Sequence, residues 1–137
     1  MTTAAYTLTA TSDLPFDDAV ERVRAELTKE GFGVLCEIDV KQTLHDKIGV
    51  EREPYLILGA CNPPLAHQAL QLEPDLGVLL PCNVVIYQLG ETTHISAIDA
   101  ERMLSLVENA ELEPISADIR ERLGRVVDRA SRGVHAD

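Results

Sequence analysis

Two Cys-Asn dipeptides, Cys61-Asn62 and Cys82-Asn83, are the residues best suited to chemistry in this sequence. A thiol can act as a nucleophile, a redox group or a ligand for soft metals, and asparagine caps helices and shapes turns. The first dipeptide follows an apolar segment over residues 55–60, and the second begins an apolar segment over residues 82–89. If both segments are strands and lie next to each other, the two thiols come close together.

The first dipeptide is followed by Pro63 and Pro64, a pattern that predicts a helix capped by Asn62. The positive end of a helix dipole attracts anions and lowers the pKa of a nearby thiol, so Cys61 is placed for chemistry. His67 lies at the border of the apolar face of the same predicted helix. The candidate ligand or redox residues are therefore Cys61, Asn62, Cys82, Asn83 and His67.

A metal centre assembled from distant segments would use Cys61, Cys82 and His67. The sequence has no Cys-x-x-Cys or His-x-x-x-His spacing of the kind that structural zinc sites use. It also has no nucleophile elbow, phosphate loop or dinucleotide fingerprint, so it favours no enzymatic reaction and identifies no cofactor.

A second interpretation makes the cysteines packing residues, because free cysteine is among the most buried residue types. Asn62 would then only cap a helix, and Asn83 would only hold a turn. Cys36, in a predicted strand beside Glu37, is expected to be a buried packing residue. Both interpretations of the Cys-Asn dipeptides stay open at this point.

Charge and composition narrow the range of partners. The net charge of −11 repels phosphate backbones, so nucleic-acid binding is not expected. Five arginines near the C-terminus, between residues 120 and 132, alternate with acidic residues and are interpreted as a solvated helix face. The N-terminus does not resemble a signal peptide, no apolar run is long enough to span a membrane, and the three cysteines are an odd number. These features predict a cytoplasmic protein without membrane contact.

Hydrophobic periodicity predicts strands over residues 3–11, 32–40, 55–60, 82–89 and 92–98. Helices are expected to begin near Asp13, Asn62, Asp99 and Ser116, with a shorter helix over residues 41–48. The short connection between the last two strands requires antiparallel pairing. We therefore expect an α+β fold with a mainly antiparallel sheet of about five strands and helices packed mostly on one face. Residues 1–137 are expected to form one domain, with an ordered body over 3–132 and a frayed tail over 133–137.

Several segments carry a family resemblance: GFGVL at 31–35, EIDV at 37–40, LGACNPPLAH at 58–67, EP at 73–74 and GVLLPCNV at 77–84. With these motifs the chain resembles, from about residue 7 to residue 130, the family catalogued as domain of unknown function 302. The resemblance implies a small α+β protein with a helix-covered antiparallel sheet and a tendency to form homodimers. It implies no established activity. It draws attention to Cys61, Asn62, Cys82 and Asn83.

Two functions are mainly considered, ahead of a third, an enzyme that uses Cys61 as its nucleophile. The chain is either a thiol-based redox, metal-binding or small-ligand-binding module centred on the two Cys-Asn dipeptides, or a structural or protein-interaction homodimer domain whose cysteines only pack.

Overall fold

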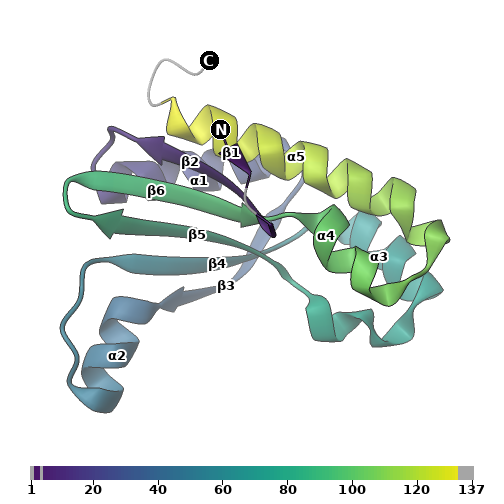
Figure 1. The fold of residues 1–137 in the computed structure, drawn as a ribbon, viewed down its shortest axis with the longest axis horizontal. Helices are drawn as coiled ribbons and strands as arrows, with labels where there is room; N and C mark the ends of the chain where they lie inside the picture. Colours follow the sequence, from purple (N-terminus) through teal and green to yellow (C-terminus); the bar gives the residue numbers. More distant parts are fainter. Residues whose placement is uncertain (1, 4, 133–137) are drawn as a thin grey trace.

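The fold is an antiparallel sheet backed by helices, seen in a computed structural model that describes residues 2–3 and 5–132 (Figure 1). The described strands follow the spatial order β1-β2-β6-β5-β4-β3, and every pair among them is antiparallel. Their bounds are β1 Thr2–Thr3, β2 Thr7–Ser12, β3 Gly33–Asp39, β4 Tyr55–Cys61, β5 Cys82–Leu89 and β6 Thr92–Ile98. The α+β class is confirmed. The expected sheet of about five strands gains the two-residue strand β1 at one edge.

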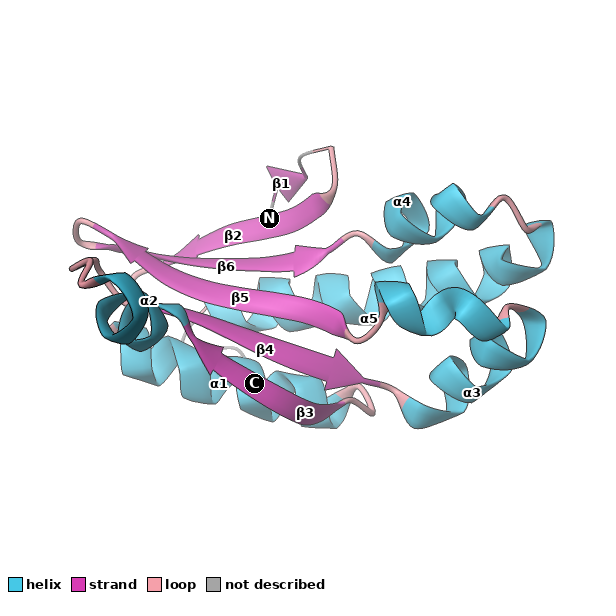
Figure 2. Ribbon diagram, turned by 90° about the horizontal axis from the view of Figure 1, so that it is seen from below, coloured by secondary structure: helices cyan, strands magenta, loops and turns pink. Residues whose placement is uncertain are grey.

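Two long helices cover one face of this sheet, as Figure 2 shows for α1 and α5. The helices α3 and α4 lie beyond the end of the sheet where β4 ends, and α2 lies near the opposite end. The α-helices are α1 Phe16–Lys29, α2 Val40–Ile48, α3 Pro63–Leu72, α4 Ala100–Leu104 and α5 Glu113–Ser131. Short 3₁₀ helices are η1 Pro74–Leu79, η2 Ser105–Val107 and η3 Ala110–Leu112.

The core lies between the sheet and the two long helices. Alternate residues of each strand point to the same face, so Leu58, Val84 and Ile95 face the helices and are fully buried. Val23 of α1 and Leu123 of α5, on the apolar stripes of their helices, are equally buried. This core is mainly aliphatic, with Phe32 as its buried aromatic residue. The opposite face of the sheet, called the outer face below, is not covered by α1 or α5 (Figure 2).

The prediction of one continuous strand over residues 3–11 is wrong, because this segment contains parts of two strands. Thr2 pairs with Thr9 and Thr3 pairs with Leu8 in antiparallel register, so the chain must reverse its direction between β1 and β2. A single strand cannot pair with itself in this way. The pattern of alternating threonines did not reveal the reversal.

Two predicted helix starts are also wrong. Asp13 does not cap α1: the N-cap is Pro15, and Ser12 orders the preceding turn by accepting a hydrogen bond from the Leu14 backbone N at 3.1 Å. Ser116 lies inside α5 and donates to the Glu113 carbonyl oxygen at 3.1 Å. Helix α5 instead continues directly from η3, which Asn109 caps. The starts at Asn62 and Asp99 are confirmed, because both side chains accept backbone N–H bonds. The tail expected over 133–137 lies outside the described residues.

The arginines of α5 and the residue after it form ion pairs with carboxylates, as the sequence predicts for a solvated face. Arg122 pairs with Asp118 at 2.8 Å, and Arg120 pairs with Asp99 at 3.1 Å. The remaining three are Arg125 and Arg129, which both contact Glu30, and Arg132, which contacts Asp128. The pairs with Asp99 and Glu30 join α5 to neighbouring segments, whereas the pairs with Asp118 and Asp128 are local contacts four residues apart.

Candidate functional site

The structure brings Cys61 and Cys82 to one pocket. Strands β4 and β5 are neighbours, with Ala60 opposite Cys82, so Cys61 lies one residue beyond that pair. Both cysteines line a pocket of about 280 Å³ where the sheet meets α3, η1, α4 and α5. Cys82 is buried with 4% of its surface exposed, and Cys61 is half-buried. The expected approach of the two cysteine-bearing segments is thus found, and all three cysteines of the chain are free.

The pocket is apolar. Its wall contains no charged residue, and most of the wall comes from aliphatic or small side chains. The lining residues are Phe32, Leu35, Ala60, Cys61, Asn62, Ala66, Ala69, Leu70, Leu76, Gly77, Leu80, Pro81, Cys82, Met103, Leu104 and Ile119. Sequence reasoning named three of them as site residues. The helical members were missed because an apolar stripe on a helix looks the same whether it faces packed core or a pocket.

Asn62 lies in the wall of this pocket, but its amide is already engaged in the fold. Its Oδ1 accepts from the Leu65 backbone N at 3.4 Å, which caps α3, and its Nδ2 donates to the Glu30 carbonyl oxygen at 3.3 Å. Only 7% of the residue is exposed. Asn62 therefore holds the pocket wall in place, and each end of its amide already makes one hydrogen bond within the fold.

The other two candidate residues lie elsewhere. Asn83 follows Cys82 in a strand and so points to the outer face, where it is exposed. His67 is exposed on α3 and does not line the pocket. The two Cys-Asn dipeptides consequently do not form one four-residue site.

A metal centre receives no support from the described part of the chain. No three His, Cys, Asp or Glu side chains among residues 2–3 and 5–132 gather closely enough to hold a metal ion. His67 stays outside the pocket that holds the two thiols. The pocket's chemistry is that of two thiols among hydrocarbon side chains.

The surroundings of the Cys82 thiol disfavour its charged form. Burial, and to a smaller extent the neighbouring Cys61 thiol, raise the pKa of Cys82 from 9.0 to about 11. At neutral pH Cys82 is therefore a protonated thiol, which is a poor nucleophile and behaves as a small apolar surface. This disfavours rapid thiol–disulfide exchange at Cys82.

Cys36 is not the buried packing residue that was expected. It is exposed on β3, which forms an edge of the sheet. Its neighbour in register is Gly59, and a Cβ at Gly59 would come within 2.5 Å of Cys36 Sγ and 2.9 Å of Pro81 Cγ. Gly59 thus leaves the space that the Cys36 side chain occupies on the outer face.

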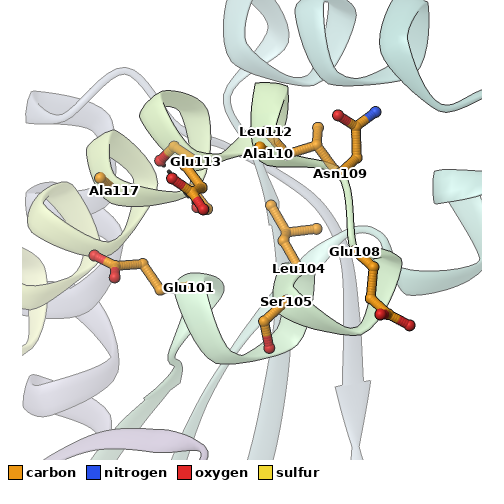
Figure 3. Close-up of a pocket in the computed structure, with 10 residues that line it drawn as sticks. Glu101, Leu104, Ser105, Glu108, Asn109, Ala110, Leu112, Glu113 and Ala117 are labelled. Carbon is orange, nitrogen blue, oxygen red and sulfur yellow. Dashed lines mark hydrogen bonds between the residues drawn. The ribbon is translucent and has the colours of Figure 1, made fainter.

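A larger cavity of about 630 Å³ lies between α4, η3 and the start of α5 (Figure 3). Its lining includes Glu101, Glu108 and Glu113. Figure 3 shows Glu108 pointing away from the other two carboxylates, so the three do not converge on one point. The cavity is an acidic surface depression and carries no arranged set of reactive groups.

These features define a class: a small α+β protein whose helix-backed antiparallel sheet carries an apolar, two-thiol pocket at its end. The chain belongs to the family described as domain of unknown function DUF302, whose model matches residues 8–130. It is similar to the crystal structure of an uncharacterized conserved DUF302 protein from Bacillus stearothermophilus, with 32% sequence identity and a TM-score of 0.87. That match covers 93% of this chain and 99% of the other. No curated protein matches the chain.

Within the described residues, no helix combines the length and the apolar character needed to cross a bilayer.

Proposed function

We propose that this chain is a small-ligand-binding module and that its site is the apolar pocket lined by Cys61 and Cys82. The observation that carries the proposal is the pocket itself, about 280 Å³ in volume and without a charged residue in its wall. An apolar protein cavity of about 150 Å³ is large enough to hold benzene. This pocket therefore has room for a molecule of two fused rings or a short hydrocarbon chain.

The wall determines the class of ligand. A carboxylate or ammonium group would lose its hydration without gaining a partner, because no charged side chain lines the pocket. The Asn62 amide already makes one hydrogen bond with Leu65 and one with Glu30, so it is held by the fold. The preferred ligand is therefore neutral and mainly hydrocarbon, with Cys82 and the half-buried Cys61 acting as soft contact surfaces.

Among the thiol-based roles considered from the sequence, ligand binding fits better than redox chemistry or metal binding. A protonated, buried Cys82 favours contact with an apolar molecule over exchange with another thiol. The three free thiols fit a reducing compartment, so we keep the cytoplasm as the proposed location.

The test is an NMR titration with naphthalene as a neutral probe and 2-naphthoate as its charged counterpart. Met103 lines the pocket and is one of only two methionines, so its methyl signal reports on the site directly. We expect saturable shifts of the Met103 methyl with naphthalene and at least tenfold weaker binding of 2-naphthoate. Equal affinity for both probes, or no shift at Met103, would contradict the proposal.

A matched pair of variants on α3 sharpens the titration. Ala66 is half-buried and lines the pocket, so Ala66→Phe should fill it and abolish the Met103 response. Gln68 is exposed on the same helix and outside the pocket, so Gln68→Phe should leave the response unchanged. If both variants behave alike, the probe binds elsewhere.

A second function, homodimer formation, is favoured by one separate observation. Helix α2 buries none of its residues, and the neighbouring edge strand β3 also exposes apolar side chains. Leu35, Ile38 and Ile48 are 67%, 46% and 68% exposed, respectively. We propose that a second copy of the chain covers this edge, because exposed edge strands pair readily and exposed apolar residues gain from burial.

Sedimentation equilibrium tests the dimer. Ile48→Lys should convert a dimer to a monomer, whereas Leu106→Lys, at an equally exposed site on η2 near the other end of the molecule, should not (Figure 1). A wild-type chain that stays monomeric at about 100 μM, far above the Kd of a stable homodimer, would rule the dimer out.

A further inference from the structure

The outer face of the sheet is uncharged over four strands. Its residues follow from strand alternation and from the registers between neighbouring strands. They include Thr7, Thr9 and Thr11 of β2, Thr92, His94, Ser96 and Ile98 of β6, Asn83, Val85, Tyr87 and Leu89 of β5, and Tyr55, Ile57 and Gly59 of β4. None is Asp, Glu, Lys or Arg, in a chain whose residues are 26% charged and whose net charge is −11. This face therefore differs from an ordinary solvated surface.

One row of this face is a stack of rings. Tyr55 stacks on Tyr87 with ring centroids 5.2 Å apart, and Tyr87 stacks on His94 at 4.9 Å. Arg52 covers the free face of the row, 4.9 Å from the centre of the Tyr55 ring. Because neighbouring rings cover both faces of Tyr87, the row presents its ring edges and phenol hydroxyls to the adjoining surface. Ring edges carry positive potential and favour electron-rich oxygen atoms.

Beside this row lies a trough of about 440 Å³ with hydroxyl groups in its floor. Thr9 Oγ1 and Ser96 Oγ lie 2.8 Å apart, and Thr9 Oγ1 also donates to Thr7 Oγ1 at 3.1 Å. Tyr6, which is 64% exposed, lines the trough together with Tyr55 and Tyr87. The trough is thus a polar but uncharged groove between aromatic side chains.

Asn83 is the polar residue in this trough that the fold does not use. It is exposed, and its side-chain amide makes no hydrogen bond with another residue in the described part of the chain. The amide supplies both a donor and an acceptor. The two residues of the second Cys-Asn dipeptide therefore lie on opposite faces of the sheet. Cys82 lines the apolar pocket, and Asn83 lines the outer trough.

We propose that this trough binds a neutral, polyhydroxylated ring, that is, a single sugar unit. No cation lines it to hold a phosphate or carboxylate, and no carboxylate lines it to hold an amine. Its hydroxyls, the Asn83 amide and the phenol groups match the alternating donors and acceptors of a sugar. An entirely apolar ligand would leave the exposed Asn83 amide without a partner, which costs binding free energy.

The experiment is an amide NMR titration of the full chain with glucose, galactose, mannose and N-acetylglucosamine, and with glucose 6-phosphate and glucuronate as charged counterparts. We expect saturable shifts at residues 83, 85 and 96 with at least one neutral sugar, at a Kd of about 1 mM or tighter. The charged counterpart should bind at least tenfold more weakly. No saturable shift with any neutral sugar would overturn the proposal.

Two threonines of β2 provide matched variants. Thr9 lines the trough, so Thr9→Val should weaken binding at least tenfold, while Thr11→Val, on the same face but outside the trough, should leave it unchanged. Equal loss in both variants would mean a general effect on the sheet and would overturn the site. If the chain is a dimer that Val85→Arg converts to a monomer, the face is a protein interface and the sugar proposal fails.

Discussion

Asn62 Nδ2 donates a hydrogen bond to the backbone carbonyl oxygen of Glu30 at 3.3 Å, across 32 positions of the sequence. The same carbonyl accepts a bond from Arg122 Nη1 at 2.8 Å. The end of α1, the start of α3 and the middle of α5 therefore meet at one backbone oxygen. Since Asn62 also lines the apolar pocket, this junction fixes the position of the pocket wall.

Replacing this asparagine should destabilise the fold. Asn62→Ala removes the cap of α3 and one of the two donors to the Glu30 carbonyl oxygen, so we expect a loss of about 2 kcal/mol in the free energy of unfolding. Urea denaturation measures it. Asn83→Ala is the matched control, because Asn83 is exposed, and should change stability by less than about 0.5 kcal/mol. Equal effects at both positions would contradict the structural role.

Glu30 should make stability depend on pH. The hydrogen bonds from Arg125 lower the pKa of Glu30 below its usual value of 4.5. As pH falls, Glu30 is therefore protonated in the unfolded chain at a higher pH than in the folded chain. The stabilisation from Glu30 is thus complete above pH 4.5 and is lost as pH falls through the folded-state pKa.

Glu30→Gln should flatten this dependence when urea denaturation is repeated between about pH 5 and pH 3. Glu21→Gln, at an exposed position on α1, serves as the control and should follow the wild type. If the stability of Glu30→Gln varied with pH as the wild type does, the ion pairs of the Glu30 carboxylate with Arg125 and Arg129 would not contribute to stability.

The three thiols should react at very different rates. Cys36 is exposed, Cys61 is half-buried, and the buried Cys82 has a pKa raised to about 11. With iodoacetamide at about pH 8, we expect Cys82 to be alkylated at least tenfold more slowly than Cys36. Peptide mass spectrometry over time gives the three rates, and denaturant should make them similar. Fast labelling of Cys82 in the folded chain would show that the pocket is open to water.

Gly59 should not tolerate a side chain while Cys36 is present. The added methyl of Gly59→Ala would lie 2.5 Å from Cys36 Sγ and 2.9 Å from Pro81 Cγ, so we expect a loss of about 1–3 kcal/mol. In a Cys36→Ala background the loss should be smaller, although the contact with Pro81 remains. A double-mutant cycle by urea denaturation measures the coupling. Additive effects would mean that the two side chains do not compete for space.

Local sequence signals were sufficient where a segment's structure depends on its own residues. The helix starts predicted at Asn62, which precedes two prolines, and at Asp99, which precedes an apolar stripe, are confirmed. Asp13 and Ser116 carried the same kind of signal, but tertiary context placed the chain differently: Ser12 ordered one turn, and η3 ran directly into α5. The reversal between β1 and β2 likewise depends on pairing, which alternation along one strand cannot reveal.

The candidate site was also predictable only where it depends on local sequence signals. The two Cys-Asn dipeptides correctly marked the end of β4 and the start of β5, whereas the pairing of these strands was only a condition that the structure meets. Alternation along the strand places Cys82 and Asn83 on opposite faces, but the sequence could not show what surrounds each of them. It also could not show that Cys36 lies on an exposed edge. The row of Tyr55, Tyr87 and His94 has no local signature at all, since three separate strands bring these rings together.

The central claim is that the pocket between Cys61 and Cys82 holds a neutral apolar molecule. A crystal structure of the chain soaked with naphthalene tests it most directly. The account predicts density for the probe within van der Waals contact of Cys82, Leu76 and Met103. Density only at other surfaces, or side chains filling the pocket with no probe bound, would contradict the claim and leave the two cysteines as packing residues.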